Sequence, residues 1–458
     1  MGTIVISNPA EAPGTSATGD VTAISKYLAG KTSAVVFFVH GVGDHCPGFA
    51  LDNTAGWLND KAVGVIGLVA KPGSSVTSTD ILDSEFLPGH PQDRASKVTV
   101  RVREFTYPAS APAAQQIPVR AIEITWSQLT QWVKTNQLGY DLTGPAEPPT
   151  TRTADCPYPQ NGEYKKPLDR EVLNHLLKEE TLDRSLVDAV LYAGTYGRVM
   201  RRGMAEALCR ALKGTRNPGG RLCTWPAVPD EPVRSQTAYF FVTHSLGSRL
   251  VYDTLLGLIG TDVTTSAGTF ANAEITASSE SVKNFIVQTA SIYMMANQLP
   301  LLGLAYEDGT HTSADGPVPY ELFMSRSPIS ATPGGAPMQN APLASVARKA
   351  NLKSSVGALA DLRMQYANKQ RQPVDTLKVV AFSDPNDLLS WGIPKWYLRP
   401  VDESRPAVEF TNVYLQNSPH WLGLIENPAP AHANYFVNDE VWRVIVCGAT
   451  KGKLNPCN

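Results

Sequence analysis

The sequence lacks several features that would indicate a metal or nucleotide site. Its six cysteines are Cys46, Cys156, Cys209, Cys223, Cys447 and Cys457. They include no CxxC pair and no histidine spacing of the kind that holds zinc. No complete G-x-x-x-x-G-K-[ST] motif is present, which argues against a phosphate-binding loop. We therefore expect no metal and no cofactor.

An excess of charge of one sign is also missing. The 40 Lys and Arg residues face 42 Asp and Glu residues, so the formal net charge is only −2. A chain so balanced has no overall field that would attract it to a polyanion. We expect no nucleic-acid partner.

Long apolar runs are absent as well. The most apolar long segment, IYMMANQLPLLGLAY from Ile292, is interrupted by Asn297, Gln298 and Pro300 and is too short to cross a bilayer. The N-terminal MGTIVISNPAEAPG has no basic n-region and no sufficient h-region. We therefore expect no transmembrane segment and a cytoplasmic protein, although signal-independent export would leave no trace in the sequence.

The cysteine content fits that expectation. Six cysteines in 458 residues are ordinary for a reduced cytosolic protein. Cys447 and Cys457 would be able to close a loop if the chain met an oxidising compartment. The sequence does not show whether any cysteine pair is oxidised.

The residues that are present predict a large core built on a sheet. The chain is 43% hydrophobic and contains unbroken β-rich runs at 33–41, 237–243 and 376–382. Such runs are typical of strands buried on both faces of a parallel sheet. The alternating segment 97–107 predicts an edge or half-covered strand. The other expected strands are 121–127, 282–291 and 408–416.

Helical periodicity separates these strands. Apolar residues recur at intervals of three and four between 170 and 214, where we expect two helices. The other expected helices are 21–28, 248–260, 343–370 and 438–446. Strands that alternate with helices predict the α/β class, with a mainly parallel sheet covered on both faces.

We expect a single large domain. It would span 33–450, after a leader at 1–32 and before a tail at 451–458. Two insertions interrupt its alternation of strands and helices. The Pro-rich segment 139–169 predicts a loop, and the Gly- and Pro-rich segment 303–342 predicts a lid-like insertion.

The segment FFVTHSLGSRLVYDTLL places a serine between a buried strand and a helix. Thr243-His244-Ser245-Leu246-Gly247 differs from G-x-S-x-G only in its first residue. In that motif a strained turn presents the serine above the carboxyl edge of the sheet as a nucleophile. The alternative is that Ser245 only caps the following helix, since serine is a favoured N-cap.

A nucleophilic serine needs a histidine base, and the base needs a carboxylate that holds its tautomer. The chain order in G-x-S-x-G hydrolases is Ser, acid, His. His311 precedes any plausible acid, which leaves His420 and His432. We prefer His432 because it stands just before the final predicted helix.

Two carboxylates follow the strand at 376–382 and are candidates for the acid. Asp384 lies in Asp-Pro-Asn-Asp, which is strong turn chemistry. Asp387 lies where the chain becomes apolar again, so its carboxylate would be buried beside an imidazole. We prefer Asp387 and keep Asp384 as the alternative.

The tetrahedral intermediate of acyl transfer needs two backbone N–H donors for its oxyanion. We assign one to Leu246, directly after the serine. We assign the other to Val42 in VHGVGDH, where the flanking glycines allow close approach of the backbone. His40 and His244 are expected to support loop packing.

Taken together, VVFFVHGVGDH, VDAVLYAGTYGRVM and VTHSLGSRLVYDTLL resemble the α/β-hydrolase superfamily. The resemblance is closest to the intracellular phosphatidic-acid-preferring phospholipases around the serine motif. AHANYFVNDEVWRVI is similar in kind to segments of lipases and inositol deacylases. The resemblance implies a serine esterase or lipase that acts in lipid metabolism, with no cofactor.

The interpretation that the sequence favours is a hydrolase of carboxylic esters, of the lipase, esterase or phospholipase type. It would act through an acyl-enzyme on a small-molecule or lipid ester. Transient contact with a membrane surface is compatible with this interpretation. Trp391, Trp396, Tyr397 and Trp421 are candidates for an acyl pocket or for an apolar rim, although ordinary core packing explains them equally well.

Two rival functions stay open. The same triad would also cleave amides or thioesters. A catalytically silent α/β-hydrolase scaffold that binds a lipid or a protein partner is the third hypothesis, because a fold does not fix a function.

Overall fold

The computed structural model describes most of the chain. The described residues are 4–9, 18–52, 56–87, 96–138, 171, 178, 182–183, 185–194, 196–217, 222–226, 236–259, 279–303, 363, 376–393, 408–418, 420–421, 425–426 and 428–456. The predicted loop 139–169, most of the predicted helix 343–370 and the lid-like insertion beyond Gly303 lie outside these ranges. Trp396 and Tyr397 do too.

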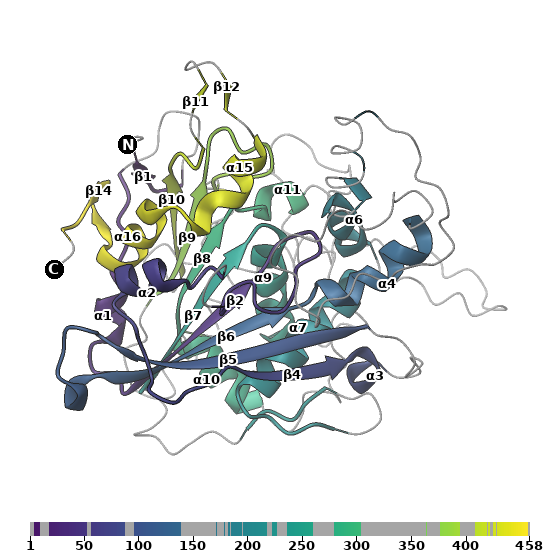
Figure 1. Cartoon of the computed structure of the whole chain (residues 1–458), viewed down its shortest axis with the longest axis horizontal. Coiled ribbons are helices and arrows are strands. Elements are labelled where there is room, and N and C mark those ends of the chain that lie inside the picture. Colours follow the sequence, from purple (N-terminus) through teal and green to yellow (C-terminus); the bar gives the residue numbers. More distant parts are fainter. Residues whose placement is uncertain are drawn as a thin grey trace, which may run out of the picture.

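A ten-stranded sheet runs through the described part of the chain (Figure 1). Six neighbouring strands are parallel, and their order is β10-β9-β8-β7-β2-β6. Their bounds are β2 Ser33–Val39, β6 Ile117–Thr125, β7 Thr237–His244, β8 Thr289–Met295, β9 Leu377–Ser383 and β10 Val408–Tyr414. The predicted α/β class with a mainly parallel sheet is confirmed.

Antiparallel strands close both edges of this sheet. β1 (Val5–Ser7) pairs with β10, while β5 (Lys97–Tyr107) pairs with β6 and carries β3 (Val69–Ala70) and β4 (Thr77–Leu82). β13 (Ala449–Thr450) and β14 (Lys453–Leu454) form a separate small hairpin. Parts of the segments expected as leader and tail therefore belong to the folded structure, because β1 completes the sheet and β14 completes the hairpin.

Helices cover the two faces of the sheet, as expected for strands buried on both sides. One face packs against α1 (Ile24–Leu28), α2 (Asp60–Ile66) and α16 (Asp439–Cys447). The other packs against α7 (Gly197–Ala211), α9 (Leu246–Ile259) and α10 (Ser279–Gln288). Figure 1 shows α1, α2 and α16 grouped together. Successive side chains such as Phe37 and Phe38 enter opposite cores, which is the period-two alternation of a strand.

Several short elements complete the described structure. They are α3 Asp83–Phe86, η1 Ala113–Gln115, α4 Ser127–Leu138, α6 Val187–Ala193, α11 Leu299–Gly303, β11 His420–Trp421, β12 Ile425–Glu426, α15 Pro428–Ala433 and η8 Asn434–Phe436.

One predicted strand is wrong. The segment 282–291 was expected to be extended, but most of it lies in α10, and β8 begins only at Thr289. Val282, Phe285 and Ile286 recur at three and four positions and are buried, so the apolar run is the inner face of a helix. A short apolar run does not by itself distinguish a buried helix from a buried strand.

The helical periodicity around α6 was interpreted correctly, and the structure shows which residues of the segment are buried. Leu182, Leu186 and Val190 recur every four residues and are 46%, 38% and 66% exposed. Asp188 and Tyr192, on the same stretch, are fully buried. The polar residues of this segment therefore face the interior.

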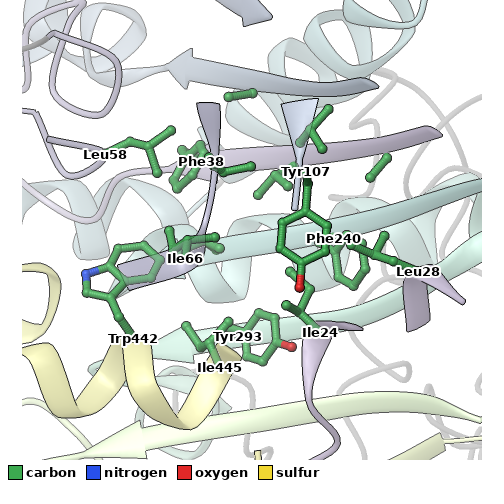
Figure 2. A pocket seen from close by; sticks show the side chains of 16 residues that line it. Ile24, Leu28, Phe38, Leu58, Ile66, Tyr107, Phe240, Tyr293, Trp442 and Ile445 are labelled. Atoms are coloured by element: carbon green, nitrogen blue, oxygen red, sulfur yellow. The ribbon is translucent and has the colours of Figure 1, made fainter. Parts of the chain in front are cut away.

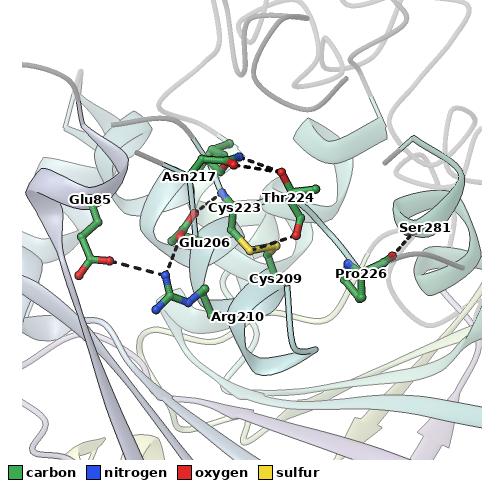
Figure 3. The surroundings of a disulfide bond; sticks show 10 residues. Glu85, Glu206, Cys209, Arg210, Asn217, Cys223, Thr224, Pro226 and Ser281 are labelled. Atoms are coloured by element: carbon green, nitrogen blue, oxygen red, sulfur yellow. Dashed lines mark hydrogen bonds and ion pairs between the residues drawn. A yellow bond between two sulfur atoms is a disulfide. The ribbon is translucent and has the colours of Figure 1, made fainter. Parts of the chain in front are cut away.

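The structure shows disulfide bonds, a point that the sequence left open. Cys209 and Cys223 form a disulfide with their Cα atoms 6.1 Å apart, and Cys46 and Cys447 are disulfide-bonded as well. Figure 3 shows Glu206 beside the Cys209–Cys223 bond, where its carboxylate accepts the Cys223 N–H at 2.6 Å. Burial raises the pKa of Glu206 to about 7, although the Cys223 N–H and Arg210 favour its ionised form.

We expect the Cys209–Cys223 bond to contribute measurably to stability. It closes a segment of sequence separation 14, and a loop of that size corresponds to about 3 kcal/mol in the chain-entropy model. The double variant Cys209→Ser/Cys223→Ser should therefore unfold at lower denaturant than the unaltered protein, with little change in the slope of the transition. Equal midpoints would show that the bond is energetically neutral.

Candidate active site

The serine motif forms a sharp turn between β7 and α9. Ser245 has a φ of 51°, in the left-handed region that a non-glycine residue rarely adopts, and its side chain is fully buried. A Cβ on Gly247 would lie 2.2 Å from the His40 carbonyl oxygen. The second glycine of the motif is therefore required by the close approach of α9 to the loop after β2.

Thr243 occupies the position of the first glycine. Its hydroxyl lies 2.9 Å from the Ser248 hydroxyl and 3.1 Å from the Tyr293 carbonyl oxygen. The threonine is fully buried, so these contacts satisfy a hydroxyl that would otherwise be costly there. They tie the strand before the turn to the helix after it and account for the departure from G-x-S-x-G.

Three side chains far apart in the sequence form one hydrogen-bonded chain. The Ser245 Oγ lies 3.1 Å from the His432 Nε2. The His432 Nδ1 lies 2.9 Å from each of the Asp387 carboxylate oxygens. His432 lies at the end of α15, directly before η8 and α16, and Asp387 lies four residues after the last residue of β9. The structure thus brings the three preferred residues together.

The environment of Asp387 favours a carboxylate. Its side chain is fully buried. Burial opposes ionisation, but hydrogen bonding and charge from His432 outweigh it, so the pKa of Asp387 lies below its ordinary value. The Leu389 N–H and the Tyr435 hydroxyl also donate to this carboxylate, at 2.9 and 3.1 Å.

The alternative acid, Asp384, has a different set of partners. One of its oxygens accepts the Asn386 N–H at 2.9 Å, and the other accepts the Asn417 N–H at 2.6 Å. Both oxygens are therefore occupied by backbone groups. Asp384 holds the turn after β9 together with the loop after β10.

The alternative base, His420, lies in a different element. Its backbone belongs to β11, which pairs with β12. The imidazole that contacts the Ser245 hydroxyl in the structure is that of His432.

The two backbone donors predicted for an oxyanion lie at the same corner. A Cβ on Gly41 would lie 2.6 Å from the Ser245 Cβ, so the loop that carries Val42 packs directly against the serine. Leu246 N–H is the first of α9, where helical N–H groups have no partner within the helix. Within the described ranges, neither of these N–H groups donates to another protein atom.

A buried ionic cluster fixes the loop that carries Val42. Asp188 accepts the Gly43 N–H at 2.8 Å and pairs with Lys134 at 3.2 Å. Lys134 also contacts Asp44 at 2.7 Å. Burial lowers the pKa of Lys134, but the two carboxylates outweigh that effect and raise it, so the ammonium stays charged. This cluster was not predicted from the sequence, although Asp188 within an apolar helical pattern was a visible signal.

Two histidines support the site as neutral imidazoles. The Nε2 of His40 accepts the Trp126 N–H at 3.0 Å. The Nε2–H of His244 donates to the His432 carbonyl oxygen at 2.8 Å. Burial, followed by repulsion from His432, lowers the pKa of His244 to about 3. The expected packing role of both histidines is consistent with these contacts, and His244 in addition ties the backbone of His432 to the serine turn.

An apolar cavity lies elsewhere, between the sheet and helices α1, α2 and α16 (Figure 2). Phe240, Tyr293 and Trp442 are among its lining residues. Its volume is about 40 Å³. Neither Ser245, Asp387 nor His432 is among its lining residues, so the cavity is separate from the serine turn.

The described residues contain neither a metal-binding cluster nor a membrane-spanning helix. No three His, Cys, Asp or Glu side chains within these ranges cluster so as to hold a metal ion. None of the helices in the same ranges combines the length and the hydropathy needed to span a bilayer.

The fold and the site define an α/β protein with a Ser–His–Asp chain at the carboxyl ends of its parallel strands. Comparison with protein-family models, with curated proteins and with solved structures finds no match to this chain. Any functional conclusion therefore rests on the geometry described above.

Proposed function

We propose that this chain is a serine hydrolase of carboxylic esters with an α/β-hydrolase fold. The observation that carries the proposal is the continuous hydrogen-bonded chain Ser245–His432–Asp387. The Ser245 hydroxyl is within proton-transfer distance of an imidazole whose other nitrogen is held by a buried carboxylate. This is the arrangement that converts a weakly nucleophilic hydroxyl into an effective nucleophile.

The proposed reaction follows from these positions. Ser245 Oγ attacks the ester carbonyl carbon while His432 Nε2 takes its proton. Asp387 holds the Nδ1–H tautomer and stabilises the imidazolium. The Val42 and Leu246 N–H groups receive the oxyanion. His432 then protonates the leaving alcohol, and a water activated by the same imidazole hydrolyses the acyl-enzyme.

Two further features support the hydrolase fold. The three residues follow the chain order Ser, acid, His that accompanies the G-x-S-x-G turn in α/β hydrolases. The serine also has the positive φ of a strained strand-to-helix turn, directly after a central parallel strand. A serine that merely capped a helix would need neither a histidine partner nor this backbone conformation.

Exposed apolar side chains close in sequence to Asp387 and His432 favour a lipid-like or other apolar acyl ester. Leu388 and Trp391 follow Asp387 closely in the chain and are 71% and 38% exposed. Val437, directly after η8, is 63% exposed. Exposed apolar side chains of this size are candidates for part of a binding surface. They would suit an acyl chain or a transient contact with a lipid surface.

A covalent probe and a substrate panel test this proposal. We expect a fluorophosphonate to label the folded protein at Ser245, and we expect hydrolysis of p-nitrophenyl esters to vary with acyl length. The panel should include phospholipids, amides and thioesters, because all share the acyl-enzyme route. Faster cleavage of amides or thioesters would redirect the proposal to those bonds. Absence of any adduct on Ser245 would favour a catalytically silent binding scaffold.

The disulfides bear on where the enzyme would act. Structural disulfides persist in oxidising compartments and are rare in the cytosol. The Cys209–Cys223 bond therefore favours an oxidising compartment over the cytoplasmic location expected from the N-terminus. Thiol labelling of the protein taken directly from its source, with and without prior reduction, would distinguish the two locations.

A further inference from the structure

Tyr435 lies beside the proposed catalytic acid. It belongs to η8, three residues after His432, and its side chain is fully buried. Its hydroxyl lies 3.1 Å from the Asp387 Oδ2 and 2.7 Å from the Asp384 backbone nitrogen. Neither the serine motif nor the candidate carboxylates pointed to this residue in the sequence.

The direction of these hydrogen bonds follows from the partners. The Asp384 N–H can only donate, so the phenol oxygen accepts from it. A carboxylate can only accept, so the phenol proton goes to the Asp387 Oδ2. The Ser390 hydroxyl, 3.4 Å away, is the remaining polar neighbour of the phenol oxygen. The phenol thus joins the turn after β9 to the carboxylate that faces His432.

We propose that Tyr435 is a positioning residue that orients the Asp387 carboxylate toward His432 and weakens its attraction for the imidazolium. The inference rests on the function proposed above, because it assigns a role within the same site. The phenol contacts the acid and not the ester, so it acts on the reaction through Asp387.

His432, Leu389 and Tyr435 share the two oxygens of the Asp387 carboxylate. The His432 Nδ1 lies 2.9 Å from both oxygens, so contact with the imidazole alone does not fix the rotation of the carboxylate. Leu389 N–H donates to Oδ1, and Tyr435 donates to Oδ2. These two donors hydrogen-bond to different oxygens and hold the carboxylate in one orientation.

The Tyr435 hydroxyl also affects the charge of Asp387, and the direction of that effect on His432 can be predicted. A donor on the Asp387 carboxylate stabilises its charge, and removing that donor leaves a more basic carboxylate beside His432. The imidazolium would then be stabilised more strongly, so the pKa of His432 should rise. The other titratable groups around the pair are His244, which burial keeps neutral, and Asp384, whose oxygens are held by backbone N–H groups. Burial and the nearby Asp387 charge raise the pKa of Tyr435 well above its ordinary value, so the phenol keeps its proton.

The variant Tyr435→Phe tests the proposal with ester hydrolysis as the readout. We expect kcat to fall about tenfold with little change in KM, as for the loss of one hydrogen bond to a charged group. The acid limb of the kcat/KM profile should move to higher pH by roughly half a unit. Tyr293→Phe is the matched control, since Tyr293 is a buried tyrosine of β8 that does not contact Asp387, and its profile should stay in place. An unmoved acid limb in Tyr435→Phe would overturn the proposal.

A second substitution covers the case in which Tyr435→Phe does not fold. Difluorotyrosine at position 435 keeps the ring and the hydroxyl but makes the phenol a stronger donor. The acid limb should then move to lower pH, opposite to the change in Tyr435→Phe. A shift in the same direction in both proteins would contradict the electrostatic role.

NMR titration separates failure of this inference from failure of the proposed function. The ring nitrogens of His432 can be followed in the folded protein without any substrate. A raised pKa of His432 in Tyr435→Phe would support the positioning role even if no ester were cleaved. An unchanged pKa in a folded, active variant would refute the role of Tyr435 and leave the hydrolase assignment intact.

Discussion

The variant Ser245→Ala is expected to lose ester hydrolysis almost completely, with kcat reduced by on the order of 10⁴- to 10⁶-fold. The substitution removes the attacking oxygen, so no acyl-enzyme can form, and fluorophosphonate labelling should disappear with it. What activity remains would come from binding and from the Val42 and Leu246 N–H groups. Steady-state hydrolysis of the best ester in the panel, together with intact-mass analysis after labelling, measures both effects.

Ser248→Ala provides the control for that result. Ser248 is fully buried within the same turn of chain, but its hydroxyl contacts Thr243 and not His432. We expect its activity to stay within a few-fold of the unaltered protein and its labelling at Ser245 to persist. If Ser245→Ala retained hydrolysis comparable to that of Ser248→Ala, another nucleophile would have to be sought.

The second large effect separates the two carboxylates that follow β9. Asp387→Asn should lower kcat by on the order of 10³- to 10⁴-fold, because an amide beside Nδ1 favours the wrong imidazole tautomer and cannot stabilise the imidazolium. The fold should survive, since the amide has nearly the same shape as the carboxylate. The kcat of purified protein, normalised to the folded fraction, is the measurement.

Asp384→Asn should give the opposite pattern. Its two oxygens accept backbone N–H groups from Asn386 and Asn417, so the amide would place an NH₂ against a donor. We expect a loss of about 1–3 kcal/mol in the free energy of unfolding, with kcat of the folded protein reduced far less than in Asp387→Asn. The reverse ranking of kcat would make Asp384 the acid of the triad.

Much of the sheet was predictable because burial is encoded locally. β5 occupies the predicted segment 97–107, and the unbroken runs at 33–41, 237–243 and 376–382 correspond to β2, β7 and β9. The prediction for the segment 282–291 failed because a short apolar run occurs both on the inner face of a helix and in a buried strand. The exposed Leu182, Leu186 and Val190 show the related limit: periodicity identifies a helix but not which of its faces lies inward.

The candidate site likewise has features that neighbouring residues predict and features that depend on distant parts of the chain. The pentapeptide around Ser245 predicted a strand-to-helix turn from its own residues. A serine followed two residues later by glycine, between a buried strand and a helix, is a signal that neighbouring residues carry. The reason that Thr243 replaces glycine was not local, since it depends on Ser248 and on a carbonyl of β8. The Cys209–Cys223 bond was equally invisible, because spacing along the chain does not give the distance between two Cα atoms.

The sequence by itself determined the α/β class, the serine turn and a short set of histidines and carboxylates, because these depend on composition, periodicity and neighbouring residues. Only the tertiary structure decided which of them meet. Ser245 and His432 are 187 residues apart, and His432 and Asp387 are 45 apart, so their contact depends on strand order and on the path of each loop at the sheet edge. The contacts of Tyr435 and Asp188 also depend on the tertiary structure. A hydrogen bond between distant segments forms only when packing places its donor and its acceptor side by side.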